Sequence, residues 1–583
     1  MKSNIIKNIA IVMASMMTLS GCNDYLTEED PNEVTTDSFW EDLSDTQAGV
    51  YAAMAALRNE YVVDVRFEAW RCDQGWPGYG RPVPQNNATG WTWYTQQYTN
   101  STSGITNKWD GLYVGVWRCN QVIEALEALN EDGSYGGDEA TWTYQMAEVR
   151  FLRGLYYFFL HSSFNEGSVV LRTKCPVTVD DFNQPLAPAD EVLEFFREDL
   201  KYAYDNLPAY NETGSIYVGM PTSAAAAAFL GTSYLYEKEY DEAKSYFYEL
   251  IYDDKYGLEL VTDMDKLFTM AGEFNSESIF EISYSADERT DIDTWDDNRM
   301  VNPLETYSLS TTGFLVPAWL VYEYYNETMD TKQEDNTGRQ VSKRASAMVA
   351  LVRDEITPYY ITGNAAEYGN YGGPTGEWGY GRYKKYTNHD IVEQYTSLQS
   401  GRNVILSRLA DVYLMYAECL LQDDDVQGAI DAINEVRKRW NLTLLGTSKD
   451  SSRTYNGWTY DRDRVMEHLM YVERPLELSV EGHQIRWQDL RRWGLLEDDS
   501  NNIFKRHSDE IFYSTSSSGL SGLSGTALSA SFPNSYIQKT AGTGSNDQKV
   551  DYEYDAAYVN YNKSRNAYYP IPSTEIMNNS MVN

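Results

Sequence analysis

The sequence predicts a mainly α-helical fold, in which tetratricopeptide-like helical hairpins form a scaffold interrupted by long irregular loops and a few short strands. Three observations support this prediction. Many segments carry apolar residues at helical spacing, two pairs of them share the offsets of a tetratricopeptide repeat, and Gly-, Asn- and aromatic-rich stretches separate them. The expected helices cover residues 45–58, 108–129, 139–162, 190–207, 222–236, 240–252, 406–421 and 426–440.

Two helix pairs, at 222–253 and 406–440, carry the repeat offsets. Small residues at these offsets let the two helices of a pair approach each other closely, so we expect helical hairpins. The residues concerned are Leu230, Gly231, Tyr234, Ala243 and Phe247 in the first pair and Ala417, Ala429 and Ile433 in the second.

The non-repeating segments are expected to be loops that carry the function. Irregular repeats of this kind indicate a scaffold whose insertions lie between the helices. The main candidates are residues 66–107 and 283–317, followed by a Gly- and Tyr-rich stretch at 363–386 and a Ser- and Gly-rich stretch at 515–544.

The N-terminus has the features of a bacterial export signal. A positive head with two lysines precedes an apolar run that is too short to span a bilayer. The run ends in the sequence LSGC, which has the pattern of a lipobox, in which the thiol of Cys22 is acylated. We therefore expect residues 1–21 to be a lipoprotein signal peptide and residues 22–583 to form a single body that a lipid anchors at the outer membrane, on the cell surface.

Strong negative charge restricts the partners of the chain. The whole sequence has a formal net charge of −40, with 87 acidic against 47 basic residues. Phosphate backbones require patches of Lys and Arg, so nucleic acid is not expected as a partner. A neutral polysaccharide or oligosaccharide is the better match.

Cysteine spacing gives no metal-binding pattern, and we expect neither a metal nor a cofactor. After the anchor, the cysteines are Cys72, Cys119, Cys175 and Cys419; Cys119 and Cys419 lie in apolar helical patterns and are predicted to be buried free thiols. The acidic stretch 287–298 lacks the Gly and the distal Glu of an EF-hand loop, which favours a solvated loop over a calcium site.

The usual catalytic signatures are also missing from the sequence, which contains no zincin helix, no Walker loop and no GxSxG motif. The prediction is therefore a binding protein and not an enzyme. Hydrolysis by a pair of carboxylates stays open at this point, because the informative separation of such a pair is spatial.

Five segments resemble, in chain order, the motif series of the SusD/RagB-type surface lipoproteins of Bacteroidetes. They are AEVRFLRGLYYFFLHSSF, LSRLADVYLMYAECLL, INEVRKRW, VERPLELSVEG followed by DLRRWG, and YYPIPSTEI. The resemblance covers nearly the whole mature chain. It departs at Pro475, which interrupts a helix that is usually unbroken, and by about two extra residues before Asp489, so we expect an irregular helix there.

This resemblance implies a glycan-binding protein that sits as a lid on a SusC-like, TonB-dependent outer-membrane barrel and is not itself an enzyme. Two alternatives stay open. A RagB-like member would capture peptides, and a pure tetratricopeptide scaffold would bind protein partners through a groove.

Loop tryptophans are the candidate sugar contacts, because hexose rings present apolar faces that stack on flat aromatic surfaces. The resemblance implies a platform built from the loop before the RFLR helix and the loop after the tetratricopeptide pair. Trp91 and Trp93 are the first choice, because alternate residues of an extended segment share a face; the alternative is that they cap the helical core. The further candidates are Trp295 and Trp76 as stacking rings and Asp73, Arg81 and Asn86 as polar partners, whereas Trp378 is assigned to the scaffold.

Overall fold

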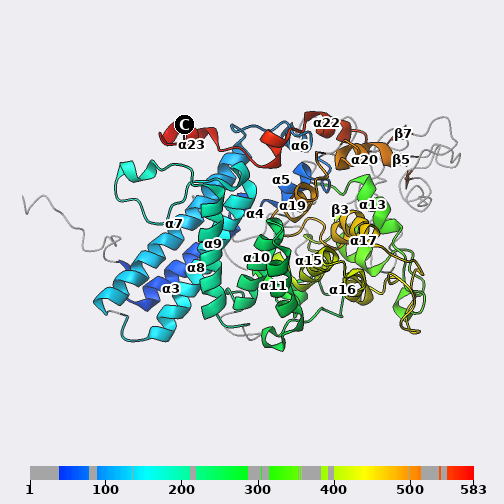
Figure 1. Ribbon diagram of the computed structural model, residues 1–583, viewed down its shortest axis with the longest axis horizontal. Coiled ribbons are helices and arrows are strands. Elements are labelled where there is room, and N and C mark those ends of the chain that lie inside the picture. Colours follow the sequence, from blue (N-terminus) through cyan, green and yellow to red (C-terminus); the bar gives the residue numbers. More distant parts are fainter. Residues whose placement is uncertain are drawn as a thin grey trace, which may run out of the picture.

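The computed structural model shows a mainly helical protein with few and short strands, as predicted (Figure 1). It describes residues 39–77, 88–133, 135–210, 218–285, 304, 314–351, 354, 356, 382–390, 400–497, 499–513, 537–539, 548–549 and 551–582. Several predictions fall outside these described residues: the signal peptide and Cys22, the acidic stretch 287–298, Trp378, and most of the segments 283–317, 363–386 and 515–544.

Four long helices form the N-terminal part of the scaffold: α3 (Leu43–Ala55), α7 (Ser103–Asp132), α8 (Glu139–Ser163) and α9 (Ala189–Asn206). Helix α8 packs against both α7 and α9, and α3 covers α7 and α8 (Figure 1). Their starts follow from capping: the Asp42 side chain accepts from the N–H groups of Ser44 and Asp45, and Asp138 caps α8 through the N–H of Thr141.

The two predicted tetratricopeptide pairs continue this row of helices. They are α10 (Ser223–Tyr236) with α11 (Tyr240–Tyr252), and α15 (Leu409–Gln422) with α16 (Val426–Arg439). Helix α11 packs directly on α15, although residues 253–408 separate them in sequence. A Cβ atom on Gly231 would lie 2.7 Å from the Phe247 ring, which confirms the predicted close approach of α10 and α11.

A short antiparallel ribbon returns the chain to the row. Strand β1 (Ser278–Ile282) pairs with β4 (Val404–Arg408), with Ile282 opposite Val404. The prediction of a helix from residue 406 is therefore wrong for three residues, because the apolar run there belongs to a strand that is almost wholly buried. The remaining strands are β2 (Val349–Ala350) with β3 (Arg382–Tyr383), and β5 (Phe512–Tyr513) between β6 (Ile537–Gln538) and β7 (Gln548–Lys549).

Short helices that the apolar spacing did not predict fill the rest of the described chain. The segment 66–107, expected as a loop, contains most of α5, all of α6 and the start of α7. The short α-helices are α4 (Glu60–Val63), α5 (Val65–Arg71), α6 (Ala88–Tyr94), α13 (Ala318–Tyr325), α14 (Lys343–Met348), α17 (Arg462–His468), α18 (Arg474–Glu477), α19 (Ile485–Arg492), α20 (Ile503–Glu510), α22 (Tyr554–Asn560) and α23 (Ser573–Asn578).

The helix around Pro475 is irregular, as predicted. A π-helical stretch (Leu469–Glu473) leads into α18, where Pro475 occupies the first turn and so needs no intrahelical N–H bond. A second π-helical stretch is Lys563–Ala567, and the 3₁₀ turns are Ala56–Arg58, Asn165–Gly167, Val179–Phe182, Asp254–Tyr256, Met270–Gly272 and Glu334–Asn336.

A buried network of ion pairs joins these elements, and Glu477 of α18 lies at its centre. The Glu477 carboxylate accepts from Arg408 at 2.8 Å and from the Trp440 indole at 2.7 Å, and Arg344 of α14 approaches it at 3.2 Å. Arg408 also reaches Glu481 at 2.7 Å. Burial alone would raise the pKa of Glu477, but the surrounding guanidinium groups lower it to about 2.

We predict that Glu477→Gln lowers the free energy of unfolding by about 3–5 kcal/mol, because it leaves buried guanidinium groups without their counter-charge. The matched control is Glu435→Gln on the surface of α16, where the pair with Lys438 is half-exposed, and its expected loss is about 0.5 kcal/mol or less.

Urea unfolding of both variants at neutral pH measures this difference, and equal losses would contradict it. Because the folded pKa of Glu477 is lowered, its contribution should be complete above its unfolded value of 4.5 and lost as the pH falls towards 2.

Candidate functional site

The structure places Trp93 in the core and not on a surface shelf. Its side chain is 1% exposed, and its ring stacks on Phe67 at 4.9 Å and on Tyr98 at 4.8 Å between centroids. The segment is helix α6 and not an extended strand, so Trp91 and Trp93 do not share a face. The predicted shelf of two indoles is therefore corrected.

Trp76 is likewise a structural residue. It is fully buried, and its backbone forms a two-bond bridge with Leu315, with N···O distances of 2.7 and 2.9 Å. Its ring meets Tyr94 edge-on at 5.5 Å. Trp76 thus fixes the segment after α5 to the chain that enters α13, and its ring is inaccessible to a sugar.

Asp73 is buried as well and serves the scaffold. Arg486 of α19 donates two hydrogen bonds, of 2.8 and 2.7 Å, to the Asp73 carboxylate, and His507 Nε2 of α20 lies 2.9 Å from the same carboxylate. Burial would raise the pKa of Asp73, but Arg486 and His507 together hold it below its usual range. Asp73 therefore joins α5 to two C-terminal helices instead of meeting a ligand.

Trp91 is the predicted residue, among those that the structure describes, whose ring remains partly accessible. It is half-buried in the middle of α6, with its ring stacked on Tyr94 at 6.0 Å between centroids. Trp295, Arg81 and Asn86 lie outside the described residues. Trp91 therefore remains a candidate sugar contact.

An arginine that the sequence analysis missed holds this aromatic region in place. The Arg71 guanidinium lies 3.8 Å from the centroid of Tyr569 and 4.1 Å from that of Trp487, and it donates to the carbonyl of Asn566 at 2.8 Å. It therefore ties the end of α5 to the C-terminal segment that contains YYPIPSTEI. These three partners lie hundreds of residues away, so local sequence spacing carries no signal for these contacts.

Cys119 and Cys419 are buried free thiols, as predicted, and Cys72 and Cys175 are also unpaired. Burial raises the pKa of Cys119 and of Cys419, which makes both thiols unreactive. Within the described residues, no cluster of three or more His, Cys, Asp or Glu is arranged to hold a metal. None of the described helices combines the length and the apolarity that crossing a membrane requires.

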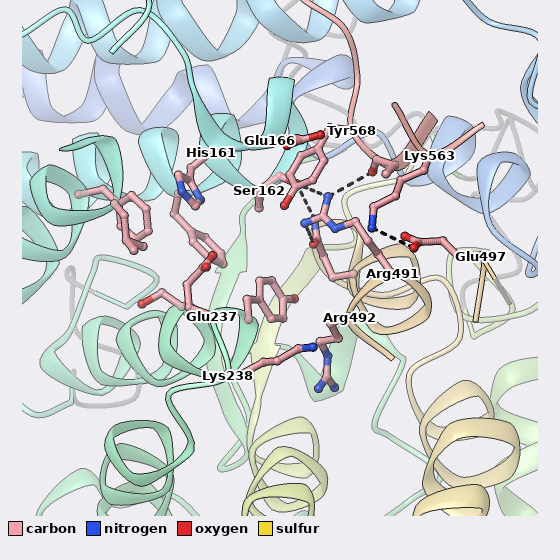
Figure 2. Close-up of a pocket in the computed structure, with 17 residues that line it drawn as sticks. His161, Ser162, Glu166, Glu237, Lys238, Arg491, Arg492, Glu497, Lys563 and Tyr568 are labelled. Atoms are coloured by element: carbon pink, nitrogen blue, oxygen red, sulfur yellow. Dashed lines mark hydrogen bonds and ion pairs between the residues drawn. The ribbon is translucent and has the colours of Figure 1, made fainter. Parts of the chain in front are cut away.

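The structure contains a cleft that had no counterpart in the sequence analysis. A cleft of about 350 Å³ lies between the C-terminal end of α8, the end of α10, helix α19 and residues 563–568, and we call it the α8–α10 cleft (Figure 2). Its polar side chains come from four segments that lie far apart in the sequence, so no local motif predicts the cleft.

The fold and these features define a class of helical binding scaffolds with a tetratricopeptide-like core. Family comparison makes the assignment specific: the model described as the SusD family matches residues 276–583, and a model described as "Starch-binding associating with outer membrane" matches residues 24–235. The chain belongs to the SusD family.

Individual relatives agree with this assignment. A SusD-like protein of Formosa agariphila is 25% identical over 506 residues, which cover 83% of this chain and 91% of the relative. A SusD superfamily protein of Bacteroides vulgatus has a similar crystal structure, with a TM-score of 0.66, 22% identity and coverage of 94% and 99% of the two chains. The structure of a laminarin-binding SusD-like protein matches with a TM-score of 0.62, 20% identity and coverage of 93% and 98%.

We predict losses of stability of very different size for Trp91 and Trp93, the two tryptophans of α6. Trp93→Ala should lower the free energy of unfolding by about 3–5 kcal/mol, because it empties a fully packed site. Trp91→Ala should cost about 1 kcal/mol or less, because its ring is half-exposed. Thermal and urea unfolding in parallel measure both, and a larger loss for Trp91→Ala would contradict the placement of these rings.

Proposed function

We propose that this protein is a lipid-anchored, cell-surface glycan-binding protein, which captures a neutral polysaccharide or oligosaccharide and delivers it to a SusC-like, TonB-dependent outer-membrane barrel. The observation that carries this proposal is membership of the SusD family. One matching model describes starch binding at the outer membrane, and a structural relative binds laminarin. The acidic composition of the chain agrees with a neutral ligand.

The proposed contact surface lies beside α6. Trp91 would supply a stacking face, and Trp295, Arg81 and Asn86 from the flanking segments would add a second ring and groups that hydrogen-bond to hydroxyls. Aromatic faces with a few polar partners are the usual chemistry of such sites. The three buried residues Trp76, Trp93 and Asp73 are not part of this proposal.

We propose no catalytic role, and the surroundings of one pair of buried carboxyl groups, Glu273 and Glu281, agree with this. Burial raises the pKa of Glu273 to about 7, and it also raises the pKa of the neighbouring Glu281. Carboxyl groups with raised pKa values can act as a general acid and base. The cavity that this pair borders has a volume of only about 20 Å³. That space holds about one water molecule and no sugar ring.

The test of glycan capture is titration with a panel of neutral polysaccharides, with acidic polysaccharides and peptides as comparison ligands. We expect binding to at least one neutral polysaccharide, with no release of reducing ends. Trp91→Ala should weaken the binding of this polysaccharide about tenfold or more, since a stacked ring contributes about 1–3 kcal/mol.

Tyr252→Phe, on the surface of α11, serves as the control for that titration and should bind as the wild type does. Binding of peptides alone would contradict glycan capture and favour the RagB-like alternative.

The anchor and the barrel partner are tested in the native membrane. Cys22→Ser should move the protein from the detergent phase to the aqueous phase in Triton partitioning, because the acyl chains hold it to the bilayer. Mildly solubilised wild type should co-purify with a large outer-membrane transporter. Retention of Cys22→Ser in the membrane, or repeated isolation of the wild type alone, would contradict the respective claim.

A further inference from the structure

The α8–α10 cleft has walls of mixed chemistry. One wall is aromatic: Tyr236 stacks on Phe158 with 5.8 Å between centroids, and Phe196 packs behind Phe158 at 5.7 Å. Arg491 and Tyr568 also line the cleft, together with Glu237, Lys238 and Glu166 (Figure 2). An ion pair between Lys563 and Glu497, at 2.9 Å, closes one side. The cleft thus combines flat apolar faces with groups that hydrogen-bond.

Arg491 uses only part of its hydrogen-bonding capacity within the protein. Its Nη1 group donates to the carbonyls of Ser162 and Ala567 at 3.1 and 3.2 Å, and Nη2 donates to Gln488. A guanidinium has five N–H groups, so two have no acceptor among the described residues. No described carboxylate lies within ion-pair distance of it. The Tyr568 ring, 3.6 Å from the guanidinium carbon, fixes its plane.

Other side chains that line the α8–α10 cleft also have polar groups without a partner among the described residues. In the part of the chain that the structure describes, the hydroxyl groups of Tyr236 and Tyr568 make no hydrogen bond, and the side chains of Glu237 and Lys238 make no ion pair. His161, at the inner end, has its pKa lowered to about 4 by burial and by the nearby cations, so its ring is neutral at neutral pH. Donors, acceptors and hydroxyl groups therefore face one cavity together.

We propose that the α8–α10 cleft is a second saccharide site, which binds one or two neutral sugar units apart from the surface beside α6. A sugar offers donors and acceptors on every side and apolar faces, which matches this mixture. A charged ligand would meet an unpaired group of its own sign, Glu237 or Arg491. The volume of about 350 Å³ falls within the range of small-molecule sites. The choice of sugar as the ligand rests on the proposed function, but none of the residues predicted for the first surface lines this cleft.

The experiment uses the full chain and three neutral disaccharides, laminaribiose, maltose and cellobiose, with glucuronic acid as a charged comparison. Saturation-transfer NMR and titration should detect at least one disaccharide. Tyr568→Phe, which removes an unused hydroxyl, should weaken it about three- to tenfold. Glu237→Gln should weaken it about tenfold or more, because hydrogen bonds to charged groups are stronger.

Matched controls separate this site from the rest of the protein. Tyr252→Phe and Glu242→Gln change the same groups on the exposed face of α11 and should leave disaccharide binding unchanged. The removed groups have no partner in the described structure, so the cleft variants should keep the wild-type melting temperature.

Each outcome decides a separate claim. The second site is overturned if no disaccharide binds, if glucuronic acid binds more tightly than all three, or if Trp91→Ala abolishes disaccharide binding while both cleft variants retain it. If Trp91→Ala abolishes disaccharide binding but the wild type still binds polysaccharide, the proposed function stands and only the second site is overturned. If the wild type binds disaccharide but no polysaccharide, the proposed polysaccharide capture is overturned instead.

Discussion

The buried ion pairs around Glu477 and Arg408 are the constraint on which the rest of the structure depends. Arg408 ends strand β4, directly before the second helical pair, and Glu477 sits in α18 behind the π-helical stretch. Neither charge is tolerable inside the protein alone, because an unpaired buried ion costs several kcal/mol. The two segments must therefore meet, and with them the helices that carry Arg439 and Arg344. Long-range pairing of this kind fixes one arrangement of short helices that have little stability of their own.

The same principle extends to the N-terminal half through Arg71 and Asp73. Both residues lie at the end of α5, and both find their partners in C-terminal segments: Arg71 at Asn566 and Tyr569, Asp73 at Arg486. The C-terminal chain then pairs with the end of α8, where the Tyr569 N–H donates to the Ser163 carbonyl at 2.8 Å. This closure places Tyr568 opposite the end of α10, so the cleft exists because the C-terminal segment is tied to α5 and to the end of α8.

The sequence allowed the long helices and both tetratricopeptide pairs to be predicted, because apolar spacing repeated over three or more turns leaves few alternatives. Short helices could not be predicted in this way. Helix α6 has seven residues, too few for a period to appear, and its sequence GWTWY fits an extended segment equally well. The error over Trp93 follows directly, since one wrong local geometry turned a core ring into a surface ring.

Asp73 and Arg491 illustrate a different limit. Each is an ordinary charged residue in its local sequence, and only the tertiary structure decides that Asp73 is fully paired while Arg491 keeps unused N–H groups. Ion pairing thereby determines which charges remain available for a ligand. Arg344, Arg408 and Arg439 are all consumed by buried carboxylates, in a chain that already has far more acidic than basic residues. Among the described residues, these three guanidinium groups are therefore unavailable to a ligand, whereas Arg491 keeps N–H groups that no described acceptor uses. Availability of a charged group is thus a property of the tertiary structure and not of the local sequence.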